Sequence, residues 1–323
     1  MNDNINISVS VIIPTRGRVE FLKRAIESVI MQHVDGMEIC IADNNTHAEL
    51  NMAVRELFGQ YEKENPAIKW TFLMSEKANA AGVRNEAMQR VKGSYILFLD
   101  DDDEFLEGSV AIRLHEIKKN PDVALLYCAA YSKIYPYPFK MYWYYEYQPW
   151  LHLDRIETMS CSCMIINREI ILSVGLSFDE DLIRRHDYDF CRRLLAMHLK
   201  VMSISKPLVI VNSHRHERIS TVPVDIKAAR QNLVNKWGPG MEQDIYDYAQ
   251  GVVLWRKCFG LENENYNQLC AELQADFNRP LSFNYKARLR LVCVSPLAYL
   301  TLYHVGVSLY QVYRNRMVPL LNR

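Results

Sequence analysis

Short apolar runs alternate with longer amphipathic segments through the first 131 residues of the chain. The apolar runs have the length and composition of buried strands, whereas the longer segments place apolar residues at helical spacing. The predicted strands are 7–14, 37–42, 69–74, 94–99 and 123–131. The predicted helices are 19–32, 48–64, 81–91 and 108–120. This alternation predicts an α/β fold with a mainly parallel, doubly wound sheet.

The pattern changes after residue 132. A stretch rich in aromatic residues and broken by prolines, 133–150, predicts a long loop. Two strands and two helices are predicted after it, at 160–167, 207–213, 168–175 and 186–198. From about residue 222 onward the apolar spacing is mostly helical. We therefore expect one α/β domain over 1–220 and a mostly helical C-terminal region over 221–323.

Composition and charge are those of an ordinary globular protein. Hydrophobic residues make up 49% of the sequence, enough for a sizeable core, and 38 basic residues balance 38 acidic ones. A balanced charge predicts no nucleic-acid partner. The eight cysteines form no Cys-x-x-Cys pairs, so we interpret them as reduced thiols of a reducing compartment. The N-terminus has neither the basic region nor the apolar length of a signal peptide, which predicts a cytoplasmic protein.

The C-terminal segment 286–316 is apolar and rich in tyrosine, with arginines at both ends. Pro296 and His304 interrupt it, which makes a full membrane span costly. Arginines at headgroup level and tyrosines at the boundary are typical of an interfacial segment. We expect peripheral attachment to the inner face of the cytoplasmic membrane. The alternative is a helical pair packed on the rest of the chain or on a second subunit.

A run of acids ends the fourth predicted strand. The sequence "YILFLDDDDEF" (95–105) places four adjacent carboxylates at the end of a buried run, beginning with Asp100. A solvated turn would tolerate them, but a divalent cation explains them better, since Mg²⁺ and Mn²⁺ prefer carboxylate oxygens. Asp43 follows the second predicted strand, and ligands of such sheets bind beyond the carboxyl ends of the strands. We therefore expect Asp43 and the acid run at one crevice.

The turn after the first strand excludes two common nucleotide sites. It reads "PTRGRVE", with one glycine, whereas dinucleotide binding needs Gly-x-Gly-x-x-Gly at this place. A P-loop is absent as well. A nucleotide could still bind through a cation that bridges its pyrophosphate and is held by carboxylates.

Five motifs in order resemble the family 2 glycosyltransferases of GT-A fold. They are "SVSVIIPTRGRVEFLKRAIESVI", "IADNNT", "AGVRNEA", "GSYILFLDDDDEF" and "IRRHDYDFCRRL", and the resemblance covers about 7–220. The resemblance implies transfer of a sugar from a nucleotide-sugar to an acceptor, with a divalent metal and with inversion at the anomeric carbon.

The resemblance also assigns the nucleotide-binding residues. The first nucleotide-contacting loop corresponds to Pro14, Thr15 and Arg16. Asp43 resembles the acid that hydrogen-bonds the base, for which the resemblance suggests a uracil imide. Ala42 replaces the first of the family's two acids, so the identity of the base stays open. Arg84 resembles an arginine that faces the nucleotide or diphosphate. From the residues alone, Asp43 could also be a turn residue and Arg84 a helix-surface arginine.

The acid run corresponds to the family's Asp-x-Asp pair, formed here by Asp100 and Asp102. The resemblance makes Asp102 the direct metal ligand and directs Asp100 or Asp101 towards the ribose. A histidine or basic residue of the family closes over the diphosphate or metal near "NSHRHERIST" (212–221). His214 and His216 both fit, and we favour His216. For either histidine a structural role is the alternative.

The motif "RRHDYDF" (184–190) corresponds to the site of the catalytic base. The resemblance gives this role to Asp187, with His186 in place of the usual Glu or Gln. An inverting transfer needs one carboxylate on the acceptor side of the anomeric carbon, where it deprotonates the attacking hydroxyl. Asp187 could instead only cap the predicted helix, because acids favour the first turn.

These inferences predict a metal-dependent, inverting glycosyltransferase of the hexosyltransferase type. Its cofactor is Mn²⁺ or Mg²⁺, its donor a UDP-sugar, and its acceptor a surface polysaccharide, lipopolysaccharide or lipid-linked oligosaccharide. Two alternatives stay open. One is a non-catalytic nucleotide-sugar-binding protein, and the other is a metal-dependent nucleotidyltransferase, which would release pyrophosphate instead of nucleoside diphosphate.

Overall fold

The protein is described by a computed structural model. The structure describes residues 7–134, 140–143, 160–182, 185–213, 226–238, 295 and 302. The chain divides into two compact units, one of 1–180 with 185–213 and one of 181–184 with 214–323. The first unit holds the sheet, and α7 (Ile226–Trp237) belongs to the second. Apart from 295 and 302, the predicted interfacial segment lies outside the described residues. Most of the predicted aromatic loop does so as well, and its described part contains a strand, Lys140–Trp143, which the sequence did not predict.

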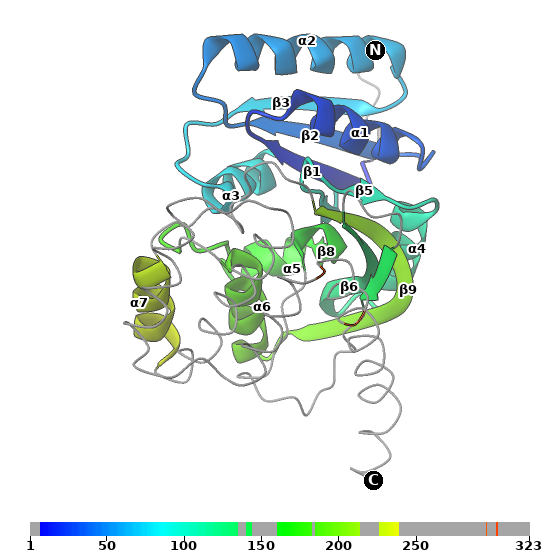
Figure 1. The fold of residues 1–323 in the computed structure, drawn as a ribbon. Coiled ribbons are helices and arrows are strands. Elements are labelled where there is room, and N and C mark those ends of the chain that lie inside the picture. Colours follow the sequence, from blue (N-terminus) through cyan, green and yellow to red (C-terminus); the bar gives the residue numbers. More distant parts are fainter. Residues whose placement is uncertain are drawn as a thin grey trace. The chain divides into compact units, whose positions relative to one another are not determined.

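One mixed sheet organises the first unit (Figure 1). Among the described residues it has nine strands in the order β3-β2-β1-β4-β8-β6-β9-β5, and β7 pairs with β6. The strands are β1 (Val9–Thr15), β2 (Met37–Asp43), β3 (Lys69–Met74), β4 (Tyr95–Phe98), β5 (Glu104–Phe105), β6 (Val123–Ile134), β7 (Lys140–Trp143), β8 (Met164–Asn167) and β9 (Lys200–Ser213). The first four in spatial order are parallel, as are β6 and β9, whereas β8 runs antiparallel between β4 and β6.

Helices cover both faces of this sheet, as the βα alternation predicts. Three of them contribute buried residues to the core on one face: α1 (Val19–Ile30), α2 (Ala48–Glu64) and α4 (Ser109–Lys118). Three contribute to the core on the other face: α3 (Ala80–Arg90), α5 (Arg168–Ser173) and α6 (His186–Ala196). The two cores hold the sheet between two helical layers.

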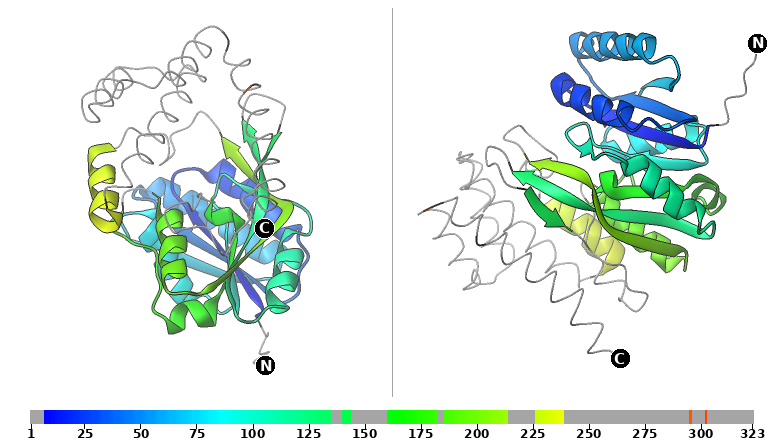
Figure 2. Two further views of the ribbon diagram at one scale, coloured as in Figure 1. Left: turned by 90° about the horizontal axis from the view of Figure 1, so that it is seen from below. Right: turned by 90° about the vertical axis from the view of Figure 1, so that its right-hand side faces the viewer.

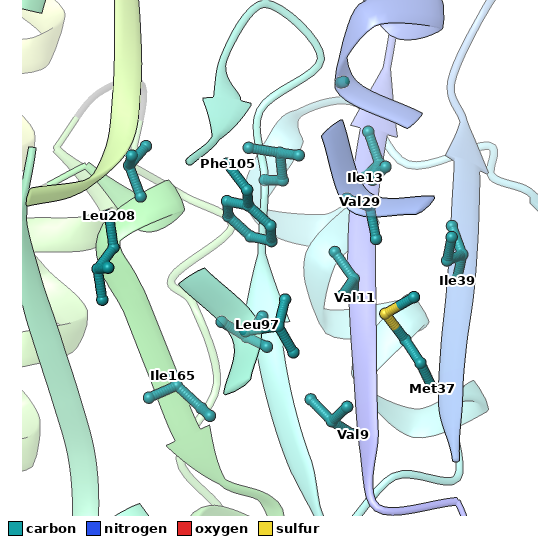
Figure 3. Packing of buried hydrophobic residues seen from close by; sticks show 14 of the residues in the cluster. Val9, Val11, Ile13, Val29, Met37, Ile39, Leu97, Phe105, Ile165 and Leu208 are labelled. Atoms are coloured by element: carbon teal, nitrogen blue, oxygen red, sulfur yellow. The ribbon is translucent and has the colours of Figure 1, made fainter. Parts of the chain in front are cut away.

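Strand β1 divides its side chains between the two cores. Val9, Val11 and Ile13 pack on the face of α1, and Figure 3 shows them beside Leu97 and Ile39 of the neighbouring strands. Ile12 points to the opposite core. Successive side chains of a strand point to opposite faces, so a strand buried on both sides reads as a continuous apolar run. This is why "VSVII" is apolar apart from Ser10, which is also buried.

The structure corrects two predicted strands. The strand predicted over 160–167 is confined to β8, because the backbone of Cys161–Cys163 forms a short 3₁₀ helix, η2, capped by Ser160. The strand predicted to begin at Pro207 instead begins at Lys200, and β9 runs beside β6 along its length (Figure 2). The register shifts between Cys128 and Ala129, where Pro207 enters the pairing, and prolines within sheets are confined to such irregularities and to edges.

The carboxyl ends of three neighbouring strands define one edge of the sheet. Thr15 at the end of β1 pairs in register with Asp43 at the end of β2. The acid run begins two residues after β4, the other neighbour of β1. The expected crevice residues therefore lie at one edge. Among the described helices, none has the length and apolar composition that crossing a membrane requires.

Candidate active site

Asp43 offers a buried carboxylate oxygen at this edge. Its Oδ1 accepts hydrogen bonds from the backbone N–H of Asn45, at 2.9 Å, and from the Asn45 side-chain amide, at 2.6 Å. Its Oδ2 is buried and has no hydrogen-bond partner among the described residues. Burial raises the pKa of Asp43, although the Asn45 hydrogen bonds act in the opposite direction. A buried acceptor without a partner is costly, and a ligand that donates a hydrogen bond relieves that cost.

The loop after β1 reaches the acid run. Thr15 is buried, and its hydroxyl donates a hydrogen bond of 2.8 Å to Oδ2 of Asp101. Pro14 lies beside it in β1, partly buried, and Arg16 is exposed. Arg18, which ends the loop, forms ion pairs with both Asp101 and Asp102. The sequence analysis did not identify Arg18.

Arg18 makes a two-pronged contact with the acid run. Its Nη1 lies 3.0 Å from Oδ2 of Asp102, and its Nη2 pairs with Oδ1 of Asp101. The net pKa of Asp101 is raised to about 7. Burial and the negative charge of Asp102 raise this pKa, and they outweigh Arg18 and the Thr15 hydrogen bond, which lower it. The planar guanidinium suits two carboxylates at once, which a lysine cannot match.

The outer members of the acid run have other partners. Asp100 pairs with Arg84 of α3. Asp103 is fully buried, and it accepts hydrogen bonds from the Ser162 hydroxyl, at 2.7 Å, and from the backbone N–H of Asn212, at 3.1 Å. Ser162 lies in η2 and Asn212 in β9, so elements far along the chain fix this loop.

Three of these carboxylates fit a divalent cation. Asp100, Asp102 and Asp103 each offer an oxygen, and these oxygens lie within 4.8 Å of one another. Carboxylate oxygens are the ligands that Mg²⁺ and Mn²⁺ prefer. The set includes Asp103, which the sequence analysis left unassigned, and it does not include Asp101. His214 and His216 lie outside the described residues.

Arg84 is buried, so it is not the exposed helix-surface arginine that was the alternative prediction. It is 6% exposed, pairs with Asp100, and stacks over the Phe178 ring at 5.8 Å. Its Nε has no hydrogen-bond partner among the described residues. Helix α3 holds the arginine there, and Asn79 caps this helix by accepting a 3.0 Å hydrogen bond from the backbone N–H of Gly82.

Asp187 lies in the first turn of α6, partly exposed, whereas its neighbour Asp189 is fully buried. Asp189 accepts a 2.7 Å hydrogen bond from Arg193 on the same helix. Burial raises the pKa of Asp187, against the Tyr188 backbone hydrogen bond and the positive charges of Arg185 and Arg84. Of the two acids in this motif, Asp187 has the surroundings of a general base.

The residue before α6 has an unusual backbone. Arg185 has φ 62° and ψ 35°, the left-handed region that residues with side chains seldom adopt. Such conformations cost on the order of 1–3 kcal/mol and cluster at functional sites. The Arg185 guanidinium also lies 5.0 Å from the Tyr188 ring centroid. The strained entry into α6 directly precedes His186 and Asp187.

Hydrogen bonds and ion pairs therefore join five of the predicted site residues into two groups, one around Arg18 and one around Arg84. Thr15 and Arg18 contact Asp101, and Arg18 extends to Asp102. Arg84 holds Asp100, and both influence the pKa of Asp187. These groups come from β1, α3, the loop after β4 and α6. The arginines of this site can bind an anionic ligand, and Oδ2 of Asp43 can accept a hydrogen bond from one. The raised pKa of Asp187 suits a group that accepts a proton.

Comparison with known families identifies the class of protein. The profile described as Glycosyl transferase family 2 matches residues 10–174, half of the chain. The chain therefore belongs to glycosyl transferase family 2. The resemblance stated from the sequence motifs is confirmed.

The curated proteins that this chain is similar to are named as glycosyltransferases. A Campylobacter jejuni GalNAc(5)-diNAcBac-PP-undecaprenol beta-1,3-glucosyltransferase is 32% identical over 103 residues, which cover 32% of each chain. The Erwinia amylovora amylovoran biosynthesis glycosyltransferase AmsB is 25% identical over 262 residues, or 75% of this chain and 82% of the relative. The match spans 64% of an uncharacterized glycosyltransferase from Methanocaldococcus jannaschii. The chain thus spans less than two thirds of the length of some relatives.

Solved structures show the same fold. S. aureus TarS 1-349 in complex with UDP-GlcNAc superposes with a TM-score of 0.53 at 14% identity, covering 95% of this chain and 92% of TarS. The mannosyltransferase of Pyrobaculum calidifontis in complex with GDP-Man and Mn²⁺ gives a TM-score of 0.50 at 15% identity, covering 95% and 87%. The predicted GT-A fold is confirmed.

Proposed function

We propose that the chain transfers a sugar, with inversion, from a nucleotide-sugar to a hydroxyl of a glycan or lipid-linked oligosaccharide. The observation that carries this proposal is the arrangement in which Arg18 pairs with Asp101 and Asp102 beside the β1 loop, while Arg84 pairs with Asp100 and its positive charge lowers the pKa of Asp187. It supplies the two separate carboxylate functions that such a transfer requires, one for the leaving diphosphate and one for the acceptor.

The donor in this proposal is a UDP-sugar. The Oδ2 atom of Asp43, which has no partner among the described residues, is an acceptor for the imide N–H of uracil. The loop of Pro14, Thr15 and Arg16 contacts the nucleotide, and Asp100 or Asp101 faces the ribose. TarS was solved with UDP-GlcNAc and the archaeal mannosyltransferase with GDP-Man. A screen of both bases therefore tests the assignment to Asp43.

The metal in this proposal is Mn²⁺ or Mg²⁺. Asp102 would hold it, with Asp100 and Asp103 as the nearest further carboxylates. The motif at 212–221 adds His216 as a candidate ligand. When bound, a divalent cation neutralises charge that develops on the departing diphosphate. The buried positions of Asp102 and Asp103 support this role, since a dry site strengthens the interaction between ions.

Asp187 is the general base of the proposed reaction. Its carboxylate takes the proton of the acceptor hydroxyl while that oxygen forms a bond to the anomeric carbon. The bond from this carbon to the diphosphate oxygen breaks on the opposite face, and the electron pair leaves with the nucleoside diphosphate. Attack and departure on opposite faces invert the anomeric configuration. The raised pKa of Asp187 supports this role, because a base with a higher pKa accepts a proton more readily.

The acceptor in this proposal is a growing surface polysaccharide, lipopolysaccharide or lipid-linked oligosaccharide. The names of the Campylobacter and Erwinia relatives, an undecaprenol-linked glucosyltransferase and an amylovoran biosynthesis enzyme, support it. Residues 1–220 would form the nucleotide-sugar-binding and catalytic domain. Residues 221–323 would bring it, through 286–316, to the inner face of the cytoplasmic membrane, where a lipid-linked acceptor is found.

A screen of nucleotide-sugars tests the proposal. The full chain is heated with Mn²⁺ and each candidate donor, and the donor that raises the unfolding temperature is then incubated with glycan acceptors. Release of nucleoside diphosphate together with a lengthened glycan supports the proposal. Release of pyrophosphate would indicate a nucleotidyltransferase instead. Binding without turnover, with every acceptor class tried, would indicate a nucleotide-sugar-binding protein.

A further inference from the structure

Arg18 contacts a carboxylate oxygen of the residue proposed as the direct metal ligand. Its Nη1 lies 3.0 Å from Oδ2 of Asp102, the residue proposed as the direct ligand, and its Nη2 pairs with Asp101. The two carboxylates are almost fully buried, with side-chain exposures of 0% for Asp101 and 3% for Asp102, whereas that of Arg18 is 26%. The guanidinium thus reaches inward from the rim of the site.

Arg18 and a divalent cation compete for the negative charge of Asp102. A cation lies about 2.0–2.6 Å from a carboxylate oxygen, which would bring it within roughly 5 Å of the guanidinium. Like charges at such a separation repel strongly where water is excluded. A carboxylate shared with an arginine is also a weaker metal ligand, because its electron density is already engaged in a charge-assisted hydrogen bond.

The Arg18 side chain is also able to move away from the acid run. It precedes α1 directly, and no side-chain hydrogen bond of its own caps that helix. It follows Gly17, which has a φ of 74°. A glycine restricts the backbone less than any other residue does. Of the two arginines that hold the acid run, Arg84 is fixed by burial and by Phe178, whereas Arg18 is the partly exposed one.

We propose that Arg18 is a built-in counter-ion of the acid run, which the divalent cation displaces from Asp102 when it binds. The inference rests on the proposed metal site and adds a positioning residue to it. In this role Arg18 keeps adjacent carboxylates compatible with folding and sets the metal concentration at which the site fills. The displaced guanidinium moves outward to the rim of the site, away from Asp102 and the cation.

The sign of a mutational effect on metal affinity tests this inference. The chelator-treated full chain is titrated with Mn²⁺, and free Mn²⁺ is followed by electron paramagnetic resonance, without substrates. In Arg18→Gln the competing cation is gone, so we expect Mn²⁺ to bind roughly tenfold more tightly, the order that one charge-assisted hydrogen bond corresponds to. The unfolding temperature should fall before Mn²⁺ is added and recover with it. The matched control Lys23→Gln removes one charge from an exposed position of α1 and should leave both quantities unchanged.

Other results overturn the inference in distinguishable ways. If Arg18→Gln binds Mn²⁺ as tightly as the natural chain, or more weakly, Arg18 is no counter-ion for the metal, while the metal site itself stands. If neither chain binds Mn²⁺, the proposed metal site fails together with the inference. Arg18→Met also removes the charge and keeps the aliphatic part of the side chain, so it serves if the glutamine variant does not fold. Mn²⁺ should again bind more tightly than in the natural chain, and unchanged or weaker binding would overturn the inference.

Discussion

Asp187 and Asp189 are two residues apart on α6, and their surroundings give them different roles. Asp189 is fully buried and paired with Arg193, whereas Asp187 is partly exposed near Arg84 and Asp100. We expect Asp187→Asn to bind donor and Mn²⁺ normally but to transfer sugar about 10²–10⁴ times more slowly, because only acceptor deprotonation is lost. Calorimetric donor affinity and kcat, measured on the same preparation, check this. A loss of donor affinity with unchanged kcat would make Asp187 a binding residue.

The pH dependence of transfer follows the same carboxyl group. Burial raises the pKa of Asp187 above the ordinary value of an aspartate. A base works only in its deprotonated form, so activity should fall as the pH decreases through this raised pKa. The fall should therefore begin at a higher pH than an exposed aspartate would give. A profile of kcat/KM against pH, at saturating Mn²⁺, measures it, and constant activity down to the ordinary aspartate range would contradict it.

A substitution at Asp43 should have opposite effects on stability and on donor binding. Its raised pKa means that the ionised carboxylate is less favourable in the folded chain than in the unfolded one, so at neutral pH it opposes folding. Asp43→Asn removes this charge and can keep an oxygen for the Asn45 hydrogen bonds. We expect the free energy of unfolding to rise, while donor affinity falls roughly tenfold. Urea unfolding and donor titration check the pair, and unchanged donor affinity would remove Asp43 from the base site.

At the scale of elements, the approach of β4 to β1 depends on one glycine. A Cβ atom on Gly93 would lie 2.5 Å from the backbone nitrogen of Ser10, and the Gly93 N–H donates to the Ser10 hydroxyl at 2.8 Å. We expect Gly93→Ala to lower the free energy of unfolding by about 1–3 kcal/mol, because backbone must shift to make room. Urea unfolding measures this loss.

The same substitution in α2 is the control. Gly59 lies in a helix, and nothing stands within 4 Å of an added Cβ. Gly59→Ala should therefore raise the free energy of unfolding by about 0.5–1 kcal/mol. Equal effects of the two substitutions would show that β4 does not approach β1 as closely as described.

The elements also show where sequence patterns are informative. Strands β1, β2 and β4 are predicted by their apolar runs, since burial on both faces leaves no other pattern. Strand β3 is also predicted, although it lies at the sheet edge and is partly exposed. The antiparallel insertion of β8 between β4 and β6 is not predicted, because an apolar run carries no information about its direction. The start of β9 was missed because Pro207 resembles a boundary, whereas the strand passes it through a register shift.

At the scale of the whole molecule, the site could be predicted only in part. The acid run, Asp43 and Asp187 are visible as motifs, because each is a short continuous sequence. Arg18 is separated by 84 residues from Asp102, and the pair becomes apparent only when β1 and β4 are known to be neighbours. The signal was present in the second arginine of "PTRGRVE", at the same sheet edge as the acids.

The central claim is that the acid run binds a metal needed for sugar transfer. Asp102→Asn keeps the shape of the side chain and removes its charge, so the test is steady-state release of nucleoside diphosphate from the preferred donor with Mn²⁺. We predict that the variant folds normally but releases product at least roughly a hundredfold more slowly, since a catalytic metal contributes several kcal/mol. EDTA should suppress the natural chain, and added Mn²⁺ should restore it. Full activity of Asp102→Asn, or of the natural chain in EDTA, would contradict the claim.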